Sequence, residues 1–330
     1  MFDTIKFVIQ EKDINYEMCF LEEIPCRISI EKCTGNRVIG RIKNIRIEVR
    51  GATLIVEGSL LKYYQGNNYA DYLTRWRTKA MVDTLSEILG VPLEKAKITR
   101  IDIGFCYNMK NPVWLYLTRL TFEGGYFRSH INKETLYFNK YDSMLCFYDK
   151  IKEMEKHKEL KEVEELKELN VTNVLRYEFR LKKVSKTFRK TIKGKDLYDI
   201  EFCQAVLDIW YNRYMNLQKT FETELSAINF YSKKDFKLFC VAFTMSRLNL
   251  SCALEEAFAK GEITSKKKYD IKEVLKDAES FITDTANCQN LIDELTIKIE
   301  NTYNRVKKDI NRPFRPWMFS KKGEKCKFSF

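Results

Sequence analysis

Tyr148 is the residue in this sequence whose position best suits covalent chemistry. It ends the expected strand 144–148, in which Leu145 and Phe147 occupy the opposite face because side chains alternate along a strand. A charged helical run follows at once and includes Lys150, so the hydroxyl lies at a strand-to-helix junction, where reactive side chains are often found. We therefore interpret Tyr148 as the leading candidate for a nucleophile, although most of the 18 tyrosines are expected to be packing residues.

Two other expected strands carry a carboxylate on the face opposite their apolar residues. Asp102 lies among alternating isoleucines, and Glu178 lies between Arg176 and Arg180. Two neighbouring carboxylates in a basic protein suit Mg²⁺ or Mn²⁺, which are hard ions that prefer oxygen ligands and leave positions open for a substrate phosphate. The sequence therefore predicts that Asp102 and Glu178 hold Mg²⁺ or Mn²⁺.

These residues suggest phosphodiester chemistry. A metal ion polarises the scissile phosphate, and the Tyr148 hydroxyl then attacks phosphorus to give a phosphotyrosine. Lys150, two residues further on, offsets charge on the pentacovalent phosphate. The alternative is that the Arg-Glu-Arg pattern is a cross-strand ion-pair ladder on a wet sheet face, without a catalytic role. A histidine-based metal site is not expected, because the chain has only His130 and His157.

The composition fits an ordered, basic, globular protein. Lys and Arg number 58 against 46 Asp and Glu, which gives a net charge of +12 and favours a partner with a phosphate backbone or another anionic surface. The ten cysteines lack paired spacing, so no zinc site is expected. The sequence shows neither a signal peptide nor an apolar run of membrane-spanning length, and we predict a cytoplasmic protein with no membrane contact.

The periodicity of the chain predicts an α+β protein. Strand patterns dominate up to residue 181, interrupted by helices at 69–89 and 150–169, and we expect an antiparallel, nuclease-like catalytic domain over residues 1–185. Beyond it the pattern is mostly helical, over about 200–224, 233–260, 265–278 and 284–304. Residues 186–330 are therefore expected to form a helical domain that binds DNA or a partner.

A basic run separates these two parts. Between Lys182 and Lys195 there are seven Lys or Arg residues and no acid, which suits contact with phosphates, although an ordinary solvated helix or linker is the alternative. A turn and basic helix over 261–276 also resemble a helix-turn-helix module. The cationic side chains that we expect to contact DNA are Lys62, Arg100, Arg176, Arg180, Lys182, Lys183, Lys186, Arg189 and Lys190.

Several segments, taken together, resemble the replication initiators of the filamentous-phage gene II type and their phage and plasmid relatives in rolling-circle replication. They cover residues 1 to about 181 in order and at sensible spacing. They are Met1–Lys6, Gly58–Asn68, Thr99–Asp102, Thr135–Phe138, Phe147–Glu153 and Leu175–Glu178.

The resemblance implies a nickase that cleaves one strand of origin DNA, stays on the 5′ phosphate and leaves a 3′ hydroxyl as primer. It implies Tyr148 as nucleophile, Asp102 and Glu178 as metal ligands, Lys150 as accessory cation, and a host helicase and polymerase as partners. Many rolling-circle initiators carry a paired-histidine metal motif, which this chain lacks. The alternatives are a non-catalytic DNA-binding replication or copy-control protein, and a mobilisation relaxase. Tyr137 and Tyr141 are alternative or second nucleophiles.

Overall fold

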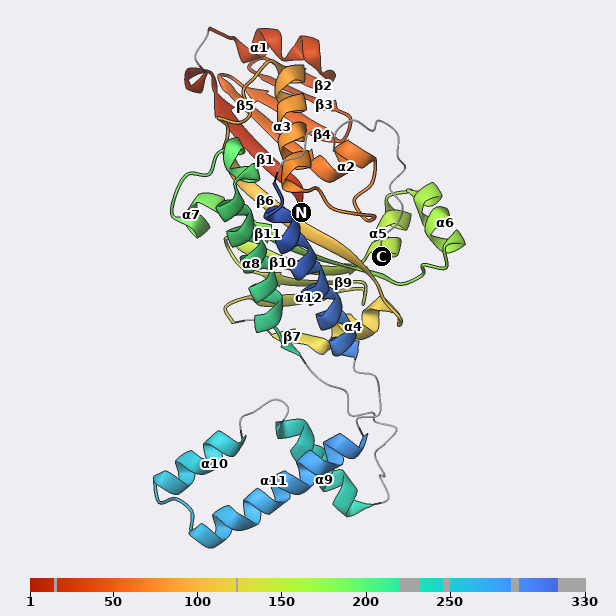
Figure 1. The fold of residues 1–330 in the computed structure, drawn as a ribbon, viewed down its shortest axis with the longest axis vertical. Helices are drawn as coiled ribbons and strands as arrows, with labels where there is room; N and C mark the ends of the chain where they lie inside the picture. Colours follow the sequence, from red (N-terminus) through yellow and green to blue (C-terminus); the bar gives the residue numbers. More distant parts are fainter. Residues whose placement is uncertain (15–16, 123, 220–231, 246–249, 286–290, 314–330) are drawn as a thin grey trace. The chain divides into compact units, whose positions relative to one another are not determined.

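A computed structural model describes residues 1–14, 17–122, 124–219, 232–245, 250–285 and 291–313 (Figure 1). The chain divides into two compact units. The first, called here the sheet unit, comprises Met1–Leu117, Glu123–Leu217 and Lys298–Phe330, and the second, the helical unit, comprises Thr118–Phe122 and Gln218–Ile297. The candidate residues named above all belong to the sheet unit.

Ten strands of the described residues form one antiparallel sheet, which confirms the predicted α+β class with an antiparallel N-terminal sheet. The first strand of the chain lies in its interior, between two strands that come later. In spatial order the strands are β2 (Ser29–Thr34), β3 (Arg37–Ile42), β4 (Ile45–Arg50), β5 (Thr53–Ser59), β1 (Phe2–Gln10), β6 (Lys97–Asn108), β11 (Val174–Leu181), β10 (Ser143–Asp149), β9 (Thr135–Asn139) and β8 (Phe127–Ile131).

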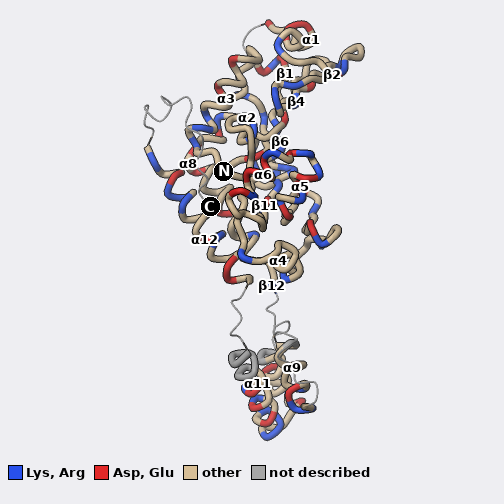
Figure 2. Tube along the Cα trace, turned by 90° about the vertical axis from the view of Figure 1, so that its right-hand side faces the viewer, with Lys and Arg blue, Asp and Glu red and all other residues tan. Residues whose placement is uncertain are grey.

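Helices cover the apolar face of this sheet. The helices α3 (Arg75–Leu89) and α8 (Ile200–Asn216) and the Lys298–Ile310 part of α12 (Leu291–Ile310) lie on one side of it (Figures 1 and 2). The core is strongly aromatic: the ring centroids of Trp210 and Tyr177 lie 5.2 Å apart, and those of Tyr177 and Phe147 lie 4.5 Å apart. The opposite face of the sheet is therefore the one that carries polar side chains.

Two helix boundaries differ from the sequence prediction because of local capping. The helix predicted from residue 69 begins only at Arg75, since the Thr74 hydroxyl accepts a hydrogen bond from the Arg77 amide and caps it. The predicted loop 59–68 instead contains α2 (Leu60–Gln65), which Ser59 caps in the same way. The predicted end of α3 at Leu89 is confirmed, because Gly90 follows with φ of 67°.

The predicted charged helix 150–169 is two helices, α5 (Lys150–Lys156) and α6 (Leu160–Glu168). Lys158 breaks it with φ of 60°, a left-handed conformation that no continuing helix adopts. The two helices are also more than a solvated surface, since their apolar residues form a separate buried cluster. Its members are Tyr69, Ala70, Ile151, Met154, Val163, Leu166, Val171 and Val174.

The two units do not follow the predicted division near residue 185. Helix α8 belongs to the sheet unit because one of its faces, which includes Phe202, Val206, Trp210 and Tyr214, is buried in the core of that unit. The predicted helix 200–224 ends at Asn216, and residues 220–224 lie outside the described part of the chain. A division of function at residue 185 stays a prediction.

The helical unit contains α9 (Lys233–Met245), α10 (Leu250–Ala259) and α11 (Ser265–Thr285). It also contains a small pair of strands, β7 (Leu120–Phe122) and β12 (Gln218–Lys219). The turn and basic helix that were predicted over 261–276 are present, since Gly261 has φ of 73° and α11 begins at Ser265.

Several short helices complete the described structure. They are α1 (Phe20–Glu23), α4 (Val113–Arg119), α7 (Val184–Phe188) and the 3₁₀ helices η1 (Glu11–Asp13), η2 (Pro25–Arg27) and η3 (Gly194–Tyr198).

No helix among the described residues is both long and apolar enough to cross a membrane.

Replacing Trp210 with Ala tests whether α8 is integral to the sheet unit. Because its ring is fully buried against Tyr177 and Phe105, Trp210→Ala should lower the free energy of unfolding by about 3 to 5 kcal/mol. The control is Phe127→Ala on β8, whose side chain is 74% exposed and whose loss should cost about 0.5 kcal/mol. Urea unfolding followed by circular dichroism measures both, and equal midpoints would contradict the assignment.

Candidate functional site

The strand register brings the predicted site residues to one face of three adjacent strands. Residues that are directly paired across neighbouring strands lie on the same face of a sheet. Tyr148 on β10 pairs with Arg176 on β11, and Arg180 on β11 pairs with Asp102 on β6. Glu178 lies between the two arginines on β11 and shares their face. The structure therefore places Tyr148, Glu178 and Asp102 on the polar face of the sheet, as the alternation of the sequence predicted.

Tyr148 and Glu178 form a direct hydrogen bond. The phenolic hydroxyl donates to Oε1 of Glu178 over 2.8 Å, and the tyrosine side chain is only 8% exposed. Burial, reinforced by the charge of Glu178, raises the pKa of Tyr148 well above its ordinary value. Burial acts in the same direction on Glu178, but Arg176 and Arg180 outweigh it and hold the pKa of Glu178 well below its usual range. Proton transfer from Tyr148 to Glu178 is thus unfavourable in this arrangement.

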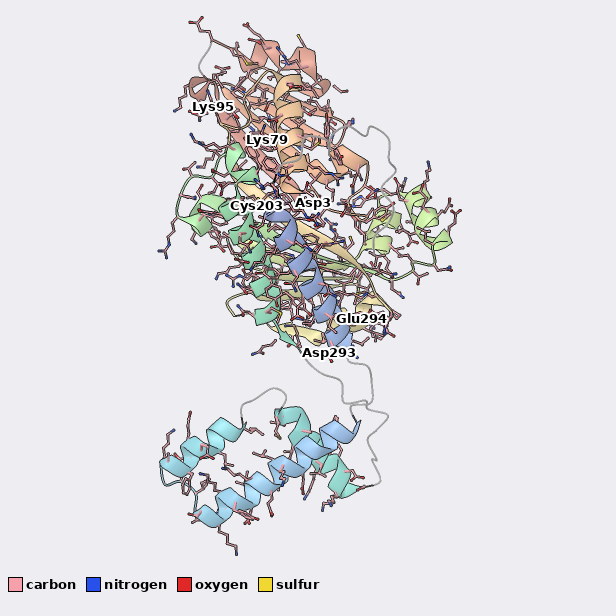
Figure 3. The ribbon with its side chains drawn as sticks, viewed as in Figure 1. Asp3, Lys79, Lys95, Cys203, Asp293 and Glu294 are labelled. Carbon is pink, nitrogen blue, oxygen red and sulfur yellow. The ribbon has the colours of Figure 1, made fainter. Side chains whose placement is uncertain are left out.

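Arg176 connects the pair to the first strand. Its side chain is fully buried, and its guanidinium bonds Glu178 Oε1 over 2.6 Å and Asp3 Oδ2 over 2.5 Å. It also donates to the backbone carbonyl of Asn68, in the loop after α2. Asp3, labelled in Figure 3, accepts a further hydrogen bond from the hydroxyl of Ser59. Sequence reasoning missed Asp3, and the only signal for it was a carboxylate inside the apolar strand at the start of the chain.

The contacts continue across the sheet as a row of alternating charges, called here the ion-pair ladder. Arg180 bonds Glu178 Oε2 over 2.7 Å and approaches Asp102 Oδ2 at 3.7 Å. Arg100 bonds Asp102 Oδ2 over 2.6 Å and Glu57 Oε1 over 3.0 Å. The members of the ladder, in order, are Lys6, Glu57, Arg100, Asp102, Arg180, Glu178, Arg176 and Asp3.

The two predicted metal ligands are of a suitable kind, but this arrangement of them does not fit a metal ion. Both oxygens of Asp102 accept hydrogen bonds from Arg100, and both oxygens of Glu178 accept from Tyr148, Arg176 or Arg180. A metal ion needs those same oxygens. Within the described ranges, no group of three or more His, Cys, Asp or Glu side chains is placed to hold a metal. Binding of Mg²⁺ or Mn²⁺ stays a prediction.

Neighbouring segments shield Tyr148. Cys106 and Val174 lie near it on the same face, and the apolar cluster of α5, α6 and Tyr69 packs against them. The Asn68 carbonyl, bonded to Arg176, brings the loop before Tyr69 to the same place. The Tyr148 hydroxyl is therefore enclosed at one end of the polar face, while Arg100 and Arg180 keep part of their side chains exposed.

Most of the other predicted residues have ion-pair partners. Lys150 is buried and its ammonium lies 2.5 Å from Glu153 Oε2. Lys62 pairs with Glu159. Arg176 differs from the other predicted DNA contacts, because it has no exposed surface and holds the two carboxylates instead.

The basic run lies beside the turn between β9 and β10. Tyr141 in this turn is largely exposed, and the ammonium of Lys183 lies 3.4 Å from the centre of its ring. Lys186 pairs with Asp142 over 3.1 Å. The remaining predicted contacts of this run, Lys182, Arg189 and Lys190, are exposed. The run therefore offers cations and an aromatic ring to solvent at one edge of the sheet unit.

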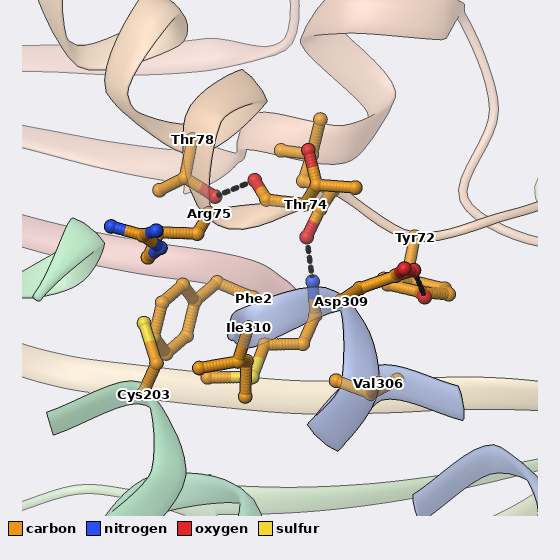
Figure 4. Close-up of a pocket in the computed structure, with 11 residues that line it drawn as sticks. Phe2, Tyr72, Thr74, Arg75, Thr78, Cys203, Val306, Asp309 and Ile310 are labelled. Carbon is orange, nitrogen blue, oxygen red and sulfur yellow. Dashed lines mark hydrogen bonds between the residues drawn. The ribbon is translucent and has the colours of Figure 1, made fainter. Parts of the chain in front are cut away.

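A small pocket elsewhere in the sheet unit is a less suitable site. Its lining is largely apolar and includes Phe2, Cys203, Val306 and Ile310, while the Tyr72 hydroxyl donates to Asp309 (Figure 4). None of the residues predicted for catalysis, metal binding or DNA contact lines it. The polar face is therefore the better candidate.

The fold is thus of the α+β class, with an antiparallel sheet that carries charged groups on one face and a basic run beside the turn between β9 and β10. A family model that describes the N-terminal part of the replication-associated gene II protein matches residues 26–201, more than half of the chain. The protein belongs to this family and is a replication-associated protein, which implies DNA binding. The resemblance to initiators of the gene II type is thereby confirmed. A comparison with curated proteins gives no match.

The family match begins at residue 26, after the strand that supplies Asp3. The site of this chain nevertheless depends on that strand, because Asp3 is the partner of a fully buried arginine.

Gly104 tests how closely the site is packed. A Cβ atom at this position would lie 2.7 Å from Cγ of Glu178 and 2.8 Å from Nη2 of Arg176. Gly104→Ala should therefore displace both side chains and lower the free energy of unfolding by about 1 to 3 kcal/mol. Gly124→Ala, where a Cβ meets nothing within 4 Å, is the control for urea unfolding. If neither variant changes the free energy of unfolding, the close packing of Gly104 against Glu178 and Arg176 is contradicted.

Asp102 should make stability depend on pH. Burial raises its pKa from 3.8 to about 6, so the folded state binds the proton more tightly than the unfolded chain. The stability that this proton provides is complete below about pH 4 and is lost as the pH rises through about 6. Asp102→Asn should lack that loss, which linkage puts at about 3 kcal/mol at most. Melting temperatures of both proteins from about pH 4 to 7 measure it, and parallel curves would contradict it.

Proposed function

We propose that the protein initiates rolling-circle replication by nicking one strand of origin DNA with Tyr148. The observation that carries the proposal is the hydrogen bond between Tyr148 and Glu178 on a charged sheet face, in a protein of a replication-associated family. The substrate class is single-stranded or origin DNA. The products are a 5′-phosphotyrosine and a free 3′ hydroxyl, from which a host helicase and polymerase continue.

The nicking step transfers a phosphodiester from DNA to the tyrosine. The Tyr148 oxygen forms a bond to phosphorus while the bond from phosphorus to the 3′ oxygen breaks, and that oxygen takes up a proton to become the 3′ hydroxyl. Glu178, already in contact with the phenol, accepts the tyrosine proton. A substrate phosphate that competes for Arg180 weakens the hold of this arginine on Glu178 and raises the pKa of Glu178. DNA binding thereby activates the base.

Arg180 and Arg100 are the groups best placed to receive the phosphate. Both keep part of their side chain exposed while they contact the carboxylates of the ladder. A guanidinium offers several fixed donors, so it can bond a phosphate and a carboxylate at the same time. The substrate then reaches Tyr148 once the cover formed by the Asn68 loop, α5 and α6 moves aside.

Two predictions stay open within this proposal. Divalent-metal dependence requires Asp102 and Glu178 to exchange their arginine contacts for Mg²⁺ or Mn²⁺, and nicking measured with Mn²⁺ or with a chelator tests it. Lys150 as accessory cation requires it to leave Glu153. We assign neither of these a step in the reaction.

A second function, non-catalytic DNA binding in replication or copy control, is favoured by the burial of Tyr148 and its raised pKa. In that case the ion-pair ladder stabilises the sheet and the basic run binds DNA. A mobilisation relaxase shares the nicking chemistry, and a neighbouring transfer origin would distinguish it.

Tyr148→Phe separates these functions. Because phenylalanine lacks the attacking oxygen, this variant should lose covalent adduct formation by at least about 1,000-fold while it still binds DNA. The assay incubates the protein with labelled single-stranded DNA from its own replicon and Mn²⁺, followed by denaturing electrophoresis and peptide mapping.

The matched controls are Tyr137→Phe and Tyr141→Phe, which should keep the adduct. An adduct that persists in Tyr148→Phe would refute the assignment of the nucleophile. DNA binding by the wild-type protein without any adduct or cleavage would favour the non-catalytic function.

A further inference from the structure

Three arginines on β3 and β4 surround a single buried carboxylate, and are called here the three-arginine patch. Arg37, Arg46 and Arg50 lie 2.6, 3.2 and 2.5 Å from the oxygens of Glu48. The arginine side chains are 40%, 44% and 57% exposed, against 6% for Glu48. The patch thus consists of accessible guanidinium groups fixed from below by one carboxylate.

The charges of this patch do not balance. Burial opposes ionisation of Glu48, but hydrogen bonds from Arg50 and Arg37 lower its pKa to about 2, so the carboxylate is charged at neutral pH. One negative charge then faces three positive ones. Each guanidinium has five N–H donors, and a shared carboxylate cannot occupy them all. The patch therefore has both the charge and the donors to hold a further anion.

The strand register strengthens this argument. Arg37 on β3 is directly paired with Arg50 on β4, and Arg41 is directly paired with Arg46. Like charges directly opposite one another destabilise a sheet. Arg41 has its own partner in Glu31, at 2.5 Å, which relieves one of these two pairs. Glu48 bonds both Arg37 and Arg50 and offsets part of their repulsion, and an anion bound to the same guanidinium groups would offset more of it.

The patch lies on the same face of the sheet as Tyr148. Direct pairings lead from Arg46 to Glu57 on β5, from Glu57 to Lys6 on β1, and from Lys6 to Arg100 on β6. The ion-pair ladder continues from Arg100 towards Tyr148. Helices α3 and α8 lie on the other side of the sheet (Figure 2). A row of charged side chains therefore joins the patch to the candidate site, and Lys6, Arg100 and Arg180 within it are partly exposed cations.

Geometry indicates how far apart the two sites are. From β4 to β10 there are five steps in the sheet order β4-β5-β1-β6-β11-β10. Strands lie about 4.8 Å apart, which gives roughly 24 Å across the strands. Along the strands, Arg46 is level with Arg100, and Tyr148 is level with Cys106 further along β6, which adds an offset of roughly 20 Å. The separation is therefore roughly 31 Å, which a DNA strand with a duplex-like rise of about 3.4 Å per nucleotide spans with about nine nucleotides. Guanidinium groups suit such a ligand, because their planar donors match phosphate oxygens in pairs.

We propose that the three-arginine patch binds the phosphate backbone of the DNA strand whose scissile phosphate lies at Tyr148, about nine nucleotides away from the nick. The identity of the strand rests on the proposed function. The patch adds binding affinity only for DNA that is long enough to reach it from the nick, and it leaves the cleavage chemistry unchanged.

The test uses the double variant Arg46→Gln/Arg50→Gln, which keeps Arg37 as the partner of Glu48 and so preserves the fold. Dissociation constants are measured for single-stranded oligonucleotides that extend about 3 or about 12 nucleotides from the nick, on either side, over a series of salt concentrations. The control is Arg77→Gln/Lys79→Gln on α3. It removes the same charge from two ion-paired residues on the other side of the sheet.

On one side of the nick, the wild-type protein should bind the oligonucleotide with the extension of about 12 nucleotides more tightly than the one with about 3. The patch variant should bind these two oligonucleotides with the same affinity. The slope of log K against log salt should fall by about 1.4 for the long arm, which corresponds to two phosphate contacts on single-stranded DNA. The control variant should behave as the wild type. An unchanged slope in the patch variant would overturn the proposal, as would binding of the patch to anionic lipid vesicles rather than to DNA.

Adduct formation at Tyr148 on the short oligonucleotides is recorded in parallel. If the wild-type protein forms the adduct but the patch variant binds DNA as the wild type does, this inference is overturned and the proposed function stands. If the patch variant loses affinity but no adduct forms with the wild-type protein, the nicking function is overturned and the DNA-binding role of the patch stands.

Discussion

The site is built around one positive charge, that of Arg176, which is buried away from water and must be paired. Arg176 is fully buried, and an unpaired guanidinium in that position would cost several kcal/mol. Its partners come from three separate parts of the sheet unit: Asp3 on β1, Glu178 on its own strand, and the Asn68 carbonyl in the loop after α2. The positions of the nucleophile candidate Tyr148 and of its cover therefore follow from satisfying Arg176. Removing Asp3 or Glu178 leaves the buried guanidinium with a single carboxylate partner.

The ion-pair ladder that includes Arg176 combines fixed and accessible groups on one sheet face. Asp102, Glu178, Arg176 and Asp3 are buried and bonded to one another or to their neighbours, which fixes their geometry, while Arg100 and Arg180 extend partly to solvent. In the proposed reaction, a phosphate from the DNA competes for these donors and changes the balance of charge around Glu178. An ion-pair ladder that stabilises the sheet is therefore compatible with the proposed chemistry, because the same contacts hold the partly exposed guanidinium groups in place.

Strand alternation was enough to predict the central features. It put Tyr148, Asp102 and Glu178 on one face, because the period of a strand is fixed by the backbone and needs no tertiary information. It could not reveal Asp3 as a partner, since the register between β1 and the later strands depends on pairing over long sequence distances. Nor could it show that Tyr148 is enclosed. That depends on a left-handed residue, Lys158, which folds α6 back, and periodicity carries no signal for such a residue.

The position of β1 has a consequence for how the molecule is made. The first strand of the chain lies in the interior of the sheet, and Asp3 meets Arg176 across 173 residues of sequence. Until β11 has been synthesised, β6 has one unpaired edge and Asp3 has no guanidinium to bind. Folding dominated by such distant contacts is slow, and exposed strand edges invite pairing with other chains. A nascent chain therefore has no assembled site, and the proposed nicking could begin only after more than half of the protein has left the ribosome.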